Sequence, residues 1–168
     1  MFRKPALLAD HHQLGDFDSG KPVLDTFLKH RALVNQQLGF SRCFVIATAD
    51  FHVVGYHALC AGMILRQHTP RPIGGHGAPD EIPVALLARL AVDRRHQRQG
   101  LGAALLKHAL SLVVAADNHV AFRAVMVHVL DAEADRFYRH YGFREAKGLE
   151  RTLLLPKGDI LAALDRSG

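Results

Sequence analysis

The sequence predicts an α/β domain built around one central β-sheet, and three observations support this fold class. The chain of 168 residues has the length of one domain with a substantial core. Apolar segments rich in β-branched and aromatic residues alternate with segments of helical periodicity, in the order β-α-β-β-β-α-β-α-β. No internal repeat, low-complexity tract or linker divides them. We therefore expect residues 1–168 to form a single domain.

The first half of the chain is expected to supply one helix and three strands. Pro22 suits the first turn of the helix and Gly39 suits its end. A break at Asp50 separates two apolar stretches and predicts an antiparallel hairpin. The expected segments are residues 4–9 (strand), 23–39 (helix), and 42–50 and 51–65 (strands).

The second half alternates strands with helices, and the first strand is expected to be buried on both faces. Between the halves, the Pro- and Gly-rich residues 66–81 predict a long loop, either a floppy connection or a lid beside a substrate. The helix after the buried strand carries an apolar stripe of Leu101, Leu105, Ala109, Leu112, Val113 and Ala116. The expected segments are residues 82–93 (strand), 101–116 (helix), 120–130 (strand), 131–142 (helix), 151–156 (strand) and 159–165 (a helical turn).

Composition narrows the class of protein. With 49% hydrophobic and 22% charged residues, the chain reads as a soluble globular protein. No apolar run approaches the roughly 20 residues of a membrane span, and the N-terminus lacks the apolar core of a signal peptide. Cys43 and Cys60 lie in apolar stretches without CxxC spacing, and the 12 histidines are scattered. We expect a cytoplasmic protein with two buried thiols, no metal site and no membrane partner.

The charge balance is basic, with a formal net charge of +5 and a sequence pI of about 9.6. A positive field attracts polyanions, which include nucleic acids and phosphorylated cofactors. A basic but uninvolved surface would give the same totals. Charge alone therefore leaves these alternatives open.

An apolar helix opens with two glycines directly behind three arginines, in the string "RRHQRQGLGAALLKHAL". Glycine is a poor helix former, so Gly100 and Gly102 indicate a need of the backbone. The first amides of a helix have no intrahelical acceptor, and glycines let an anion approach them. Ala103 after Gly102 excludes the Walker pattern, and Leu105 stands where the Rossmann fingerprint needs a third glycine. The turn is interpreted as an anion cradle, with an ordinary flexible turn as the alternative.

The longer string "LARLAVDRRHQRQGLGAALL" resembles the acetyl-CoA motif of the GNAT acetyltransferases, whose loop reads Q/R-x-x-G-x-G/A. Downstream, "ADRFYRHYGF" is similar to the A-x-x-F-Y-x-x-x-G-F signature of that family, with a strand between the two motifs. The resemblance spans roughly residues 40–156. It implies the GNAT fold, with a mixed and mostly antiparallel sheet flanked by helices, and direct acetyl transfer from acetyl-CoA.

The resemblance also implies roles for individual residues. Amides from Arg98 to Ala103 would hold the cofactor pyrophosphate, and the amide near Val92 would polarise the thioester carbonyl. Tyr138 would protonate the departing thiolate as the general acid. The residues expected to bind the cofactor are Leu90, Ala91, Val92, Gln97, Arg98, Gln99, Gly100, Leu101, Gly102, Ala103 and Asp131.

The residues themselves offer another interpretation of Tyr138. It shares helical spacing with Ala134, Phe137 and Tyr141, which is the pattern of ordinary core packing. Without the resemblance, Tyr138 would be read as a core aromatic, and Tyr141 keeps that interpretation.

The N-terminal half is similar to the GNAT toxins of toxin–antitoxin pairs, through "FDSGKPVLDTFL" and "IPVALLARLAVD". Ser19 stands where those toxins usually have cysteine and Ala88 where they usually have glycine. Such toxins acetylate the α-amino group of aminoacyl-tRNA and block translation. The resemblance implies a ribbon-helix-helix antitoxin as partner, and a homodimer would extend the basic surface.

A polyphosphate acceptor would be held mainly by cationic side chains. The candidates for this patch are Arg66, Arg71, Arg89, Arg94 and Arg95. Two other functions stay open: a small-molecule or protein N-acetyltransferase of the same fold, and a non-catalytic CoA-binding regulatory domain. No helix-turn-helix or zinc signature supports a sequence-specific DNA-binding protein. No general base is evident in the sequence.

Overall fold

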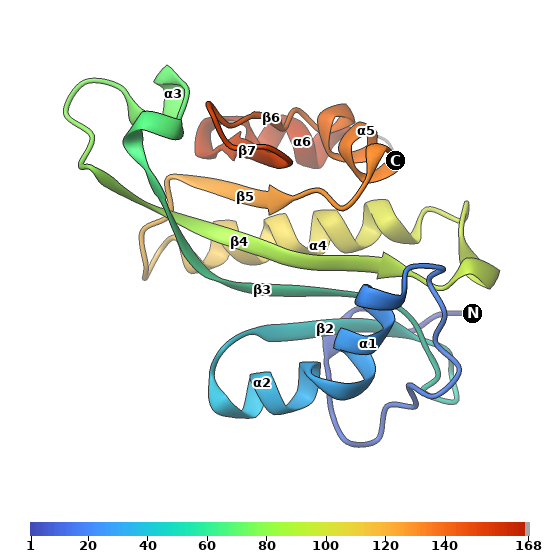
Figure 1. The fold of residues 1–168 in the computed structure, drawn as a ribbon. Coiled ribbons are helices and arrows are strands. Elements are labelled where there is room, and N and C mark those ends of the chain that lie inside the picture. Colours follow the sequence, from blue (N-terminus) through green and yellow to red (C-terminus); the bar gives the residue numbers. More distant parts are fainter. Residues whose placement is uncertain (167–168) are drawn as a thin grey trace. The chain divides into compact units, whose positions relative to one another are not determined.

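The computed structural model describes residues 1–166, and its strands form one mixed sheet flanked by helices (Figure 1). Within these residues seven strands are hydrogen-bonded in the order β1-β2-β3-β4-β5-β7-β6. The strands are β1 (Ala6–Leu7), β2 (Arg42–Ala47), β3 (Val53–Leu65), β4 (Glu81–Val92), β5 (Ala124–His128), β6 (Arg144–Glu145) and β7 (Thr152–Pro156). The α-helices are α1 (Pro22–His30), α2 (Ala32–Leu38), α3 (Arg71–Gly74), α4 (Leu101–Ala116), α5 (Ala132–His140) and α6 (Ile160–Asp165).

The sheet is mostly antiparallel, as the resemblance implied. β2 pairs antiparallel with β1 and β3, and β7 pairs antiparallel with β5 and β6. The neighbours β4 and β5 run parallel, with Val84 opposite Ala124 and Leu87 opposite Val127. The 16-residue helix α4 connects these two strands, which is the crossover that parallel pairing requires. The predicted α/β class with one central mixed sheet is confirmed.

The chain separates into two compact units, which are described one at a time. Of the described residues, the N-terminal unit contains Met1–Cys60 and Ala88–Ala109, and the C-terminal unit contains Ala61–Leu87 and residues 110–166. In the N-terminal unit, Phe17, Leu28 and Tyr56 are among the side chains of a buried cluster beneath α1 and α2. In the C-terminal unit, Ile73, Ile82 and Leu154 belong to a second buried cluster. The prediction of a single domain stays a prediction.

Several elements differ from the sequence-based expectation. The helix expected over 23–39 is two helices, because Arg31 leaves the helical region at φ −124° and ψ −30°. Pro22 opens α1 and Gly39 ends α2 in the left-handed conformation at φ 86°, as predicted. The two-residue strand β6 was not expected. Its antiparallel register with β7 depends on partners that are distant in the sequence.

The buried face of α4 is wider than the predicted stripe. Leu105 and Leu106 are both fully buried, and Leu110 is too. At the end of the helix, however, Leu112 is only half-buried and Ala116 is exposed. The burial therefore covers adjacent positions early in the helix and ends one turn before the predicted limit.

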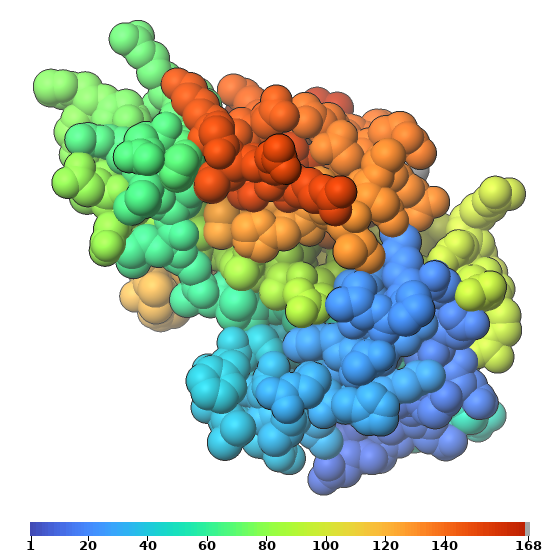
Figure 2. All heavy atoms as spheres, viewed as in Figure 1, coloured from blue at the N-terminus to red at the C-terminus, as the bar shows by residue number. Residues whose placement is uncertain are grey.

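Residues 66–81 fold back onto the C-terminal unit. The Arg66 amide donates to the carbonyl of Asp80, and the Lys147 amide donates to the carbonyl of His68, each at 2.9 Å. Figure 2 shows this segment, in green, lying against the dark orange chain that precedes β7. Ile73 anchors the segment in the core with 1% of its surface exposed. The expected loop contains a turn of 3₁₀ helix at Arg66–His68 and the short helix α3.

Two further features concern membrane-spanning helices and the cysteine thiols. Among residues 1–166, no helix is both long and apolar enough to cross a membrane. Both cysteines are free thiols: Cys43 is buried, as expected, and Cys60 is only half-buried. Burial raises the pKa of Cys43 to about 12, so this thiol stays protonated at neutral pH.

Candidate functional site

The glycine turn follows β4 and leads into α4 in the N-terminal unit. A 3₁₀ turn at Arg94–His96 comes first, and the chain then passes through two left-handed residues, Arg98 at φ 63° and Gly100 at φ 79°. A Cβ added at Gly100 would meet no atom within 4 Å, so the need here is conformational. Gly102 lies inside the first turn of α4. The two glycines therefore have different roles: Gly100 turns the chain, and Gly102 removes a side chain from the helix start.

The Asp93 carboxylate fixes the shape of this turn. It is fully buried and accepts the amides of Asp18 at 3.0 Å and Arg95 at 2.8 Å. It also accepts Nε and Nη2 of Arg95, each at 2.9 Å, which is a bidentate ion pair. Burial alone would raise the pKa of Asp93, but these hydrogen bonds outweigh it and lower the pKa to about 2. Asp93 is thus a charged anchor at the end of β4.

The N-terminal segment closes the other side of the turn. The Arg94 amide donates to the carbonyl of Asp18 at 2.8 Å, and its Nη2 pairs with the Asp18 carboxylate at 3.2 Å. Nη2 of Arg95 donates to the carbonyl of Asp16 at 2.8 Å. Gln97 donates to the carbonyl of Val92 at 3.0 Å. Side chains that looked like free cations or cofactor contacts in the sequence therefore hold the turn together.

Arg98 differs from its neighbours. It is exposed, and within residues 1–166 it makes no hydrogen bond or ion pair. Gln99 and Gly100 beside it are exposed as well. The Leu101 side chain, in contrast, is buried in a small cluster with Ile46 and Leu105, so only the backbone of Leu101 is available to a ligand.

This turn fits a phosphorylated ligand. The amides of Leu101, Gly102 and Ala103 begin α4 and have no acceptor in the preceding turn of helix. A 16-residue helix also places partial positive charge at this end. The open space in front of Gly100 and the unpaired guanidinium of Arg98 add access and charge. The residues present can therefore hold the pyrophosphate of CoA.

The end of β4 places three predicted residues in the same unit. Ala91 belongs to the buried cluster with Phe17 and Tyr56, and Leu90 and Val92 pack against the cluster around Leu105. The Ala91 side chain is therefore buried, whereas Leu90 and Val92 are only half-buried. The backbone of Leu90–Val92 is the part of this stretch that a cofactor is predicted to contact.

Tyr138 lies in the C-terminal unit, on α5. Its ring makes edge contacts with Phe137 at 5.1 Å and Phe143 at 5.3 Å between centroids, and 7% of the residue is exposed. Burial raises the pKa of Tyr138, so the phenol keeps its proton at neutral pH. Tyr141 is buried more deeply, and its hydroxyl has no hydrogen-bond partner within residues 1–166. Core packing accounts for the position of both tyrosine rings. A protonated phenol is also the form that a general acid needs.

Asp131 caps α5. Its Oδ1 accepts the amide of Ala134 at 2.9 Å, which is the usual bond of an N-cap residue. This gives Asp131 a structural role beside the predicted cofactor contact, which stays a prediction.

The arginines predicted to form a tRNA patch have unequal environments. Arg89 is half-buried with its guanidinium over the ring of Phe27 at 4.8 Å, so it packs inside the N-terminal unit. In the C-terminal unit, Arg66 pairs with Asp80 at 2.9 Å, and Arg71 is exposed at the start of α3. Arg94 and Arg95 hold the turn after β4. Of this set, Arg71 has the surroundings of a solvated surface cation.

Two polar clusters were not found from the sequence. The first is the network in which Asp18 bonds to Asp93 and Arg94, which lie 75 and 76 positions further along the chain, and no local spacing indicates these bonds. The second is a histidine pair in the N-terminal unit, where Nε2 of His57 lies 2.9 Å from Nδ1 of His108. His57 is fully buried, and burial followed by the neighbouring His108 lowers its pKa to about 3. Only the position of both histidines inside apolar segments could have suggested burial.

Comparisons with known proteins agree on one family. Residues 40–145 match the model of the acetyltransferase (GNAT) domain, which is more than half of the chain. A tRNA-acetylating toxin of Mycobacterium tuberculosis (strain ATCC 25618 / H37Rv) is 42% identical over 142 residues, which are 84% of each chain.

Solved structures give the same result. AtaT complexed with acetyl-methionyl-tRNAfMet superposes with a TM-score of 0.88 at 28% identity, covering 96% of this chain and 98% of AtaT. A tyrosine-to-phenylalanine mutant of AtaT bound to acetyl-CoA and the C-terminus of the antitoxin AtaR superposes with a TM-score of 0.80 at 27% identity, covering 98% and 99%.

Proposed function

The chain belongs to the GNAT acetyltransferase family, and from this premise we propose that it is a toxin that acetylates the α-amino group of aminoacyl-tRNA and so blocks translation. The observation that carries the proposal is the 42% identity to a tRNA-acetylating toxin over 84% of both chains. The likeness to AtaT in complex with an acetylated aminoacyl-tRNA supports the same acceptor. The net charge of +5 suits a polyphosphate substrate.

Cofactor binding is assigned to the turn after β4. The thioester of acetyl-CoA supplies an activated acetyl group that passes directly to the amine nitrogen while CoA leaves as a thiol. The amides of Leu101, Gly102 and Ala103 bind the pyrophosphate, and Arg98 adds a free positive charge. The backbone of Leu90–Val92 binds the pantetheine arm, with the Val92 amide as the donor to the carbonyl oxygen.

Tyr138 is proposed as the general acid. Its raised pKa keeps a proton on the hydroxyl oxygen, ready for the sulfur of the leaving group. The incoming amine must be neutral to attack. An α-amino group has a pKa of about 8, so it loses its first proton to water without a dedicated base. After the C–N bond has formed and the C–S bond has broken, the nitrogen gives up a second proton, which restores the hydroxyl of Tyr138.

Further parts of the proposal concern the setting of the enzyme. An antitoxin is proposed as the neutralising partner, because AtaT is bound by the C-terminus of AtaR. A homodimer, a cytoplasmic location and a single catalytic domain over residues 1–168 complete the proposal.

The test uses labelled acetyl-CoA with bulk tRNA, aminoacylated in one reaction and deacylated in the other. Label is expected only on the aminoacylated tRNA, and alkaline hydrolysis should release it as an acetylated amino acid. The Tyr138→Phe variant runs beside the wild type. Labelled small amines or peptides in the presence of unlabelled aminoacyl-tRNA would contradict the proposed acceptor and favour a metabolite or protein acetyltransferase.

A further inference from the structure

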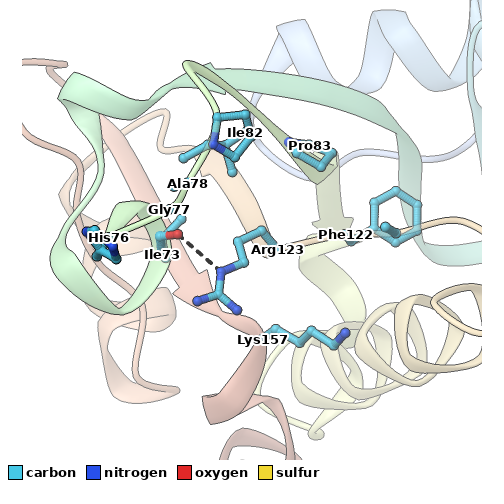
Figure 3. Close-up of a pocket in the computed structure, with 12 residues that line it drawn as sticks. Ile73, His76, Gly77, Ala78, Ile82, Pro83, Phe122, Arg123 and Lys157 are labelled. Carbon is cyan, nitrogen blue, oxygen red and sulfur yellow. Dashed lines mark hydrogen bonds between the residues drawn. The ribbon is translucent and has the colours of Figure 1, made fainter.

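A cavity of about 450 Å³ opens in the C-terminal unit at the N-terminal ends of β4 and β5 (Figure 3). Its walls include Ile73, Ile82, Pro83, Phe122, Arg123 and Lys157. This volume lies within the range of pockets that hold small ligands, roughly 300–1,000 Å³. The turn after β4 follows the other end of that strand. None of the residues assigned to acetyl-CoA lines the cavity.

The backbone holds the walls together. The Arg123 amide donates to the carbonyl of Pro83 at 2.9 Å, and the Lys157 amide donates to the carbonyl of Arg123 at 3.1 Å. The three residues are therefore fixed side by side, although they are distant in the sequence. A site with a pre-formed frame needs little ordering when a ligand binds.

Arg123 is fixed as a cation without a counter-ion. Its Nε donates to the carbonyl of Ile73 at 3.1 Å and its Nη2 to the carbonyl of Pro72 at 2.9 Å. Figure 3 shows the guanidinium in the middle of the view, between the segment that carries Ile73 and the side chain of Lys157. Both partners are neutral carbonyls, and Arg123 forms no ion pair within residues 1–166. Its positive charge therefore stays uncompensated.

The other cations near the cavity differ in how far they are neutralised. Lys157 pairs with Asp117 at 2.6 Å, so Arg123 remains the principal free charge. The exposed His76 lines the cavity, and the exposed Arg71 begins the short helix that leads into the wall. No carboxylate side chain belongs to the described lining. The cavity thus favours an anion.

The rest of the cavity wall is apolar, and two side-chain rings form part of it. The rings of Pro83 and Phe122 present surfaces against which a planar group can pack, and Ile82 adds an aliphatic surface. Aromatic side chains bind nucleobases by stacking, with little dependence on the base. Figure 3 shows the ring of Phe122 apart from the guanidinium of Arg123, toward the right of the view. A fixed guanidinium and an apolar wall within one cavity match a phosphate joined to a nucleoside.

We propose that this cavity binds one nucleotide of the tRNA substrate, with the phosphate on Arg123 and the nucleoside against Pro83 and Phe122. The inference rests on the proposed function, which supplies RNA as the substrate class. An RNA ligand is favoured over an acidic peptide because the lining offers the rings of Pro83 and Phe122 to a nucleoside as well as a cation to its phosphate.

The test measures binding without acetyl transfer, so it separates this inference from the proposed function. Deacylated bulk tRNA carrying a 3′ fluorophore is titrated with the full chain, and anisotropy gives Kd at several KCl concentrations. Arg123→Gln should weaken binding about tenfold and reduce the slope of log Kd against log [KCl] by about one. Arg123→Lys keeps the charge but loses the planar fork, so it should retain the salt slope of the wild type and recover part of the affinity.

A matched control is Arg42→Gln, since Arg42 is an exposed arginine whose Nη1 also donates to a backbone carbonyl. This variant removes the same charge and should stay within twofold of the wild type. Unchanged affinity and salt slope in Arg123→Gln would overturn the proposal. Equal losses in Arg123→Gln and Arg123→Lys, with a lower melting temperature, would reduce Arg123 to a brace for the segment 66–81 and would also overturn it.

Two parallel probes separate the sources of the anion. Fluorescent polyglutamate stands for an acidic peptide, and AMP stands for a free nucleotide. If Arg123→Gln weakens polyglutamate or AMP binding while tRNA binding is unchanged, the cavity belongs to that ligand and the RNA proposal fails. If charged tRNA is not acetylated but tRNA binding still depends on Arg123, the acceptor proposal fails while this inference stands.

Discussion

The turn after β4 and the surroundings of Tyr138 carry the two halves of the predicted chemistry, and they are stabilised by different forces. In the turn, one buried carboxylate receives four hydrogen bonds from Asp18 and Arg95. Around Tyr138 the contacts are between rings, with centroids 5.1–5.3 Å apart. The turn should therefore respond to changes of charge. The aromatic cluster should respond to changes of volume and tolerate the loss of a hydroxyl.

The largest expected effect tests the aromatic side of this comparison. Tyr138→Phe keeps the ring contacts and removes the proposed acid, so kcat should fall about 10²- to 10³-fold with the affinity for acetyl-CoA unchanged. Single-turnover kinetics and calorimetry with acetyl-CoA measure the two quantities. Tyr141→Phe is the control, because its buried hydroxyl has no hydrogen-bond partner in the described part of the chain and its loss should leave kcat unchanged. A similar kcat in both variants would remove Tyr138 from the mechanism.

The second effect tests the charged side. Asp93→Asn keeps the shape but removes the charge that holds Arg95, and it should lower the free energy of unfolding by about 2 kcal/mol. The folded pKa of about 2 lies below the ordinary value of 3.8, so the stabilisation is present above pH 4 and disappears as the pH falls toward 2. Urea unfolding from pH 7 down to about pH 2 measures both features. If the variant and the wild type differ equally at every pH, the charge is not the source of the stability.

The third effect separates the shape of the turn from its stability. Gly102→Leu places a side chain at the start of α4, where the amides are proposed to bind a pyrophosphate, so the Kd for acetyl-CoA should rise roughly tenfold or more. The fold should persist, because leucine is a better helix former than glycine. Calorimetry with acetyl-CoA and circular dichroism give the two readouts. Undiminished affinity in a folded variant would contradict the cradle.

The smallest expected effect concerns the histidine pair, which lies in the same unit as the turn. The folded pKa of His57, about 3, is below the ordinary 6.5, so the unfolded chain binds a proton first as the pH falls. The contribution of neutral His57 to the free energy of unfolding should be complete well above pH 6.5 and should be smaller by about 1.4 kcal/mol at pH 5.5. Thermal unfolding at about pH 8 and at about pH 5.5 measures the change. His57→Phe should make the profile flatter, and an unaltered slope would assign the pH dependence to other groups.

The sequence predicted the elements that carry the motifs well. β4 and α4 agree with the expected ranges to within one residue, because a run of apolar residues and a helical period are local signals. The boundary at Arg31 was missed because neither glycine nor proline marks it. β6 was missed because a two-residue strand exists only through its pairing with β7.

The candidate site was predictable in outline only. The motif located the turn and Tyr138, and the family is confirmed. The use of Arg94 inside the turn was not visible, because its partner Asp18 comes from a segment that only folding brings close. Arg95 pairs with Asp93 two residues before it, but its second partner, the carbonyl of Asp16, is equally distant in the sequence. In the sequence, the arginines next to the binding motif looked like residues that bind a ligand, although Arg94 and Arg95 stabilise the backbone of the turn. The assignment of individual cofactor contacts stays a prediction.

The bond between Asp93 and the amide of Asp18 also sets an order of events during synthesis. Asp18 leaves the ribosome 75 residues before its partner. At about 5–20 residues per second, the N-terminal segment waits roughly 4–15 s for the carboxylate that orders it. The nascent chain therefore has no complete cofactor turn until more than half of it has been made. An enzyme that acts on the substrates of translation is thus assembled late in its own translation.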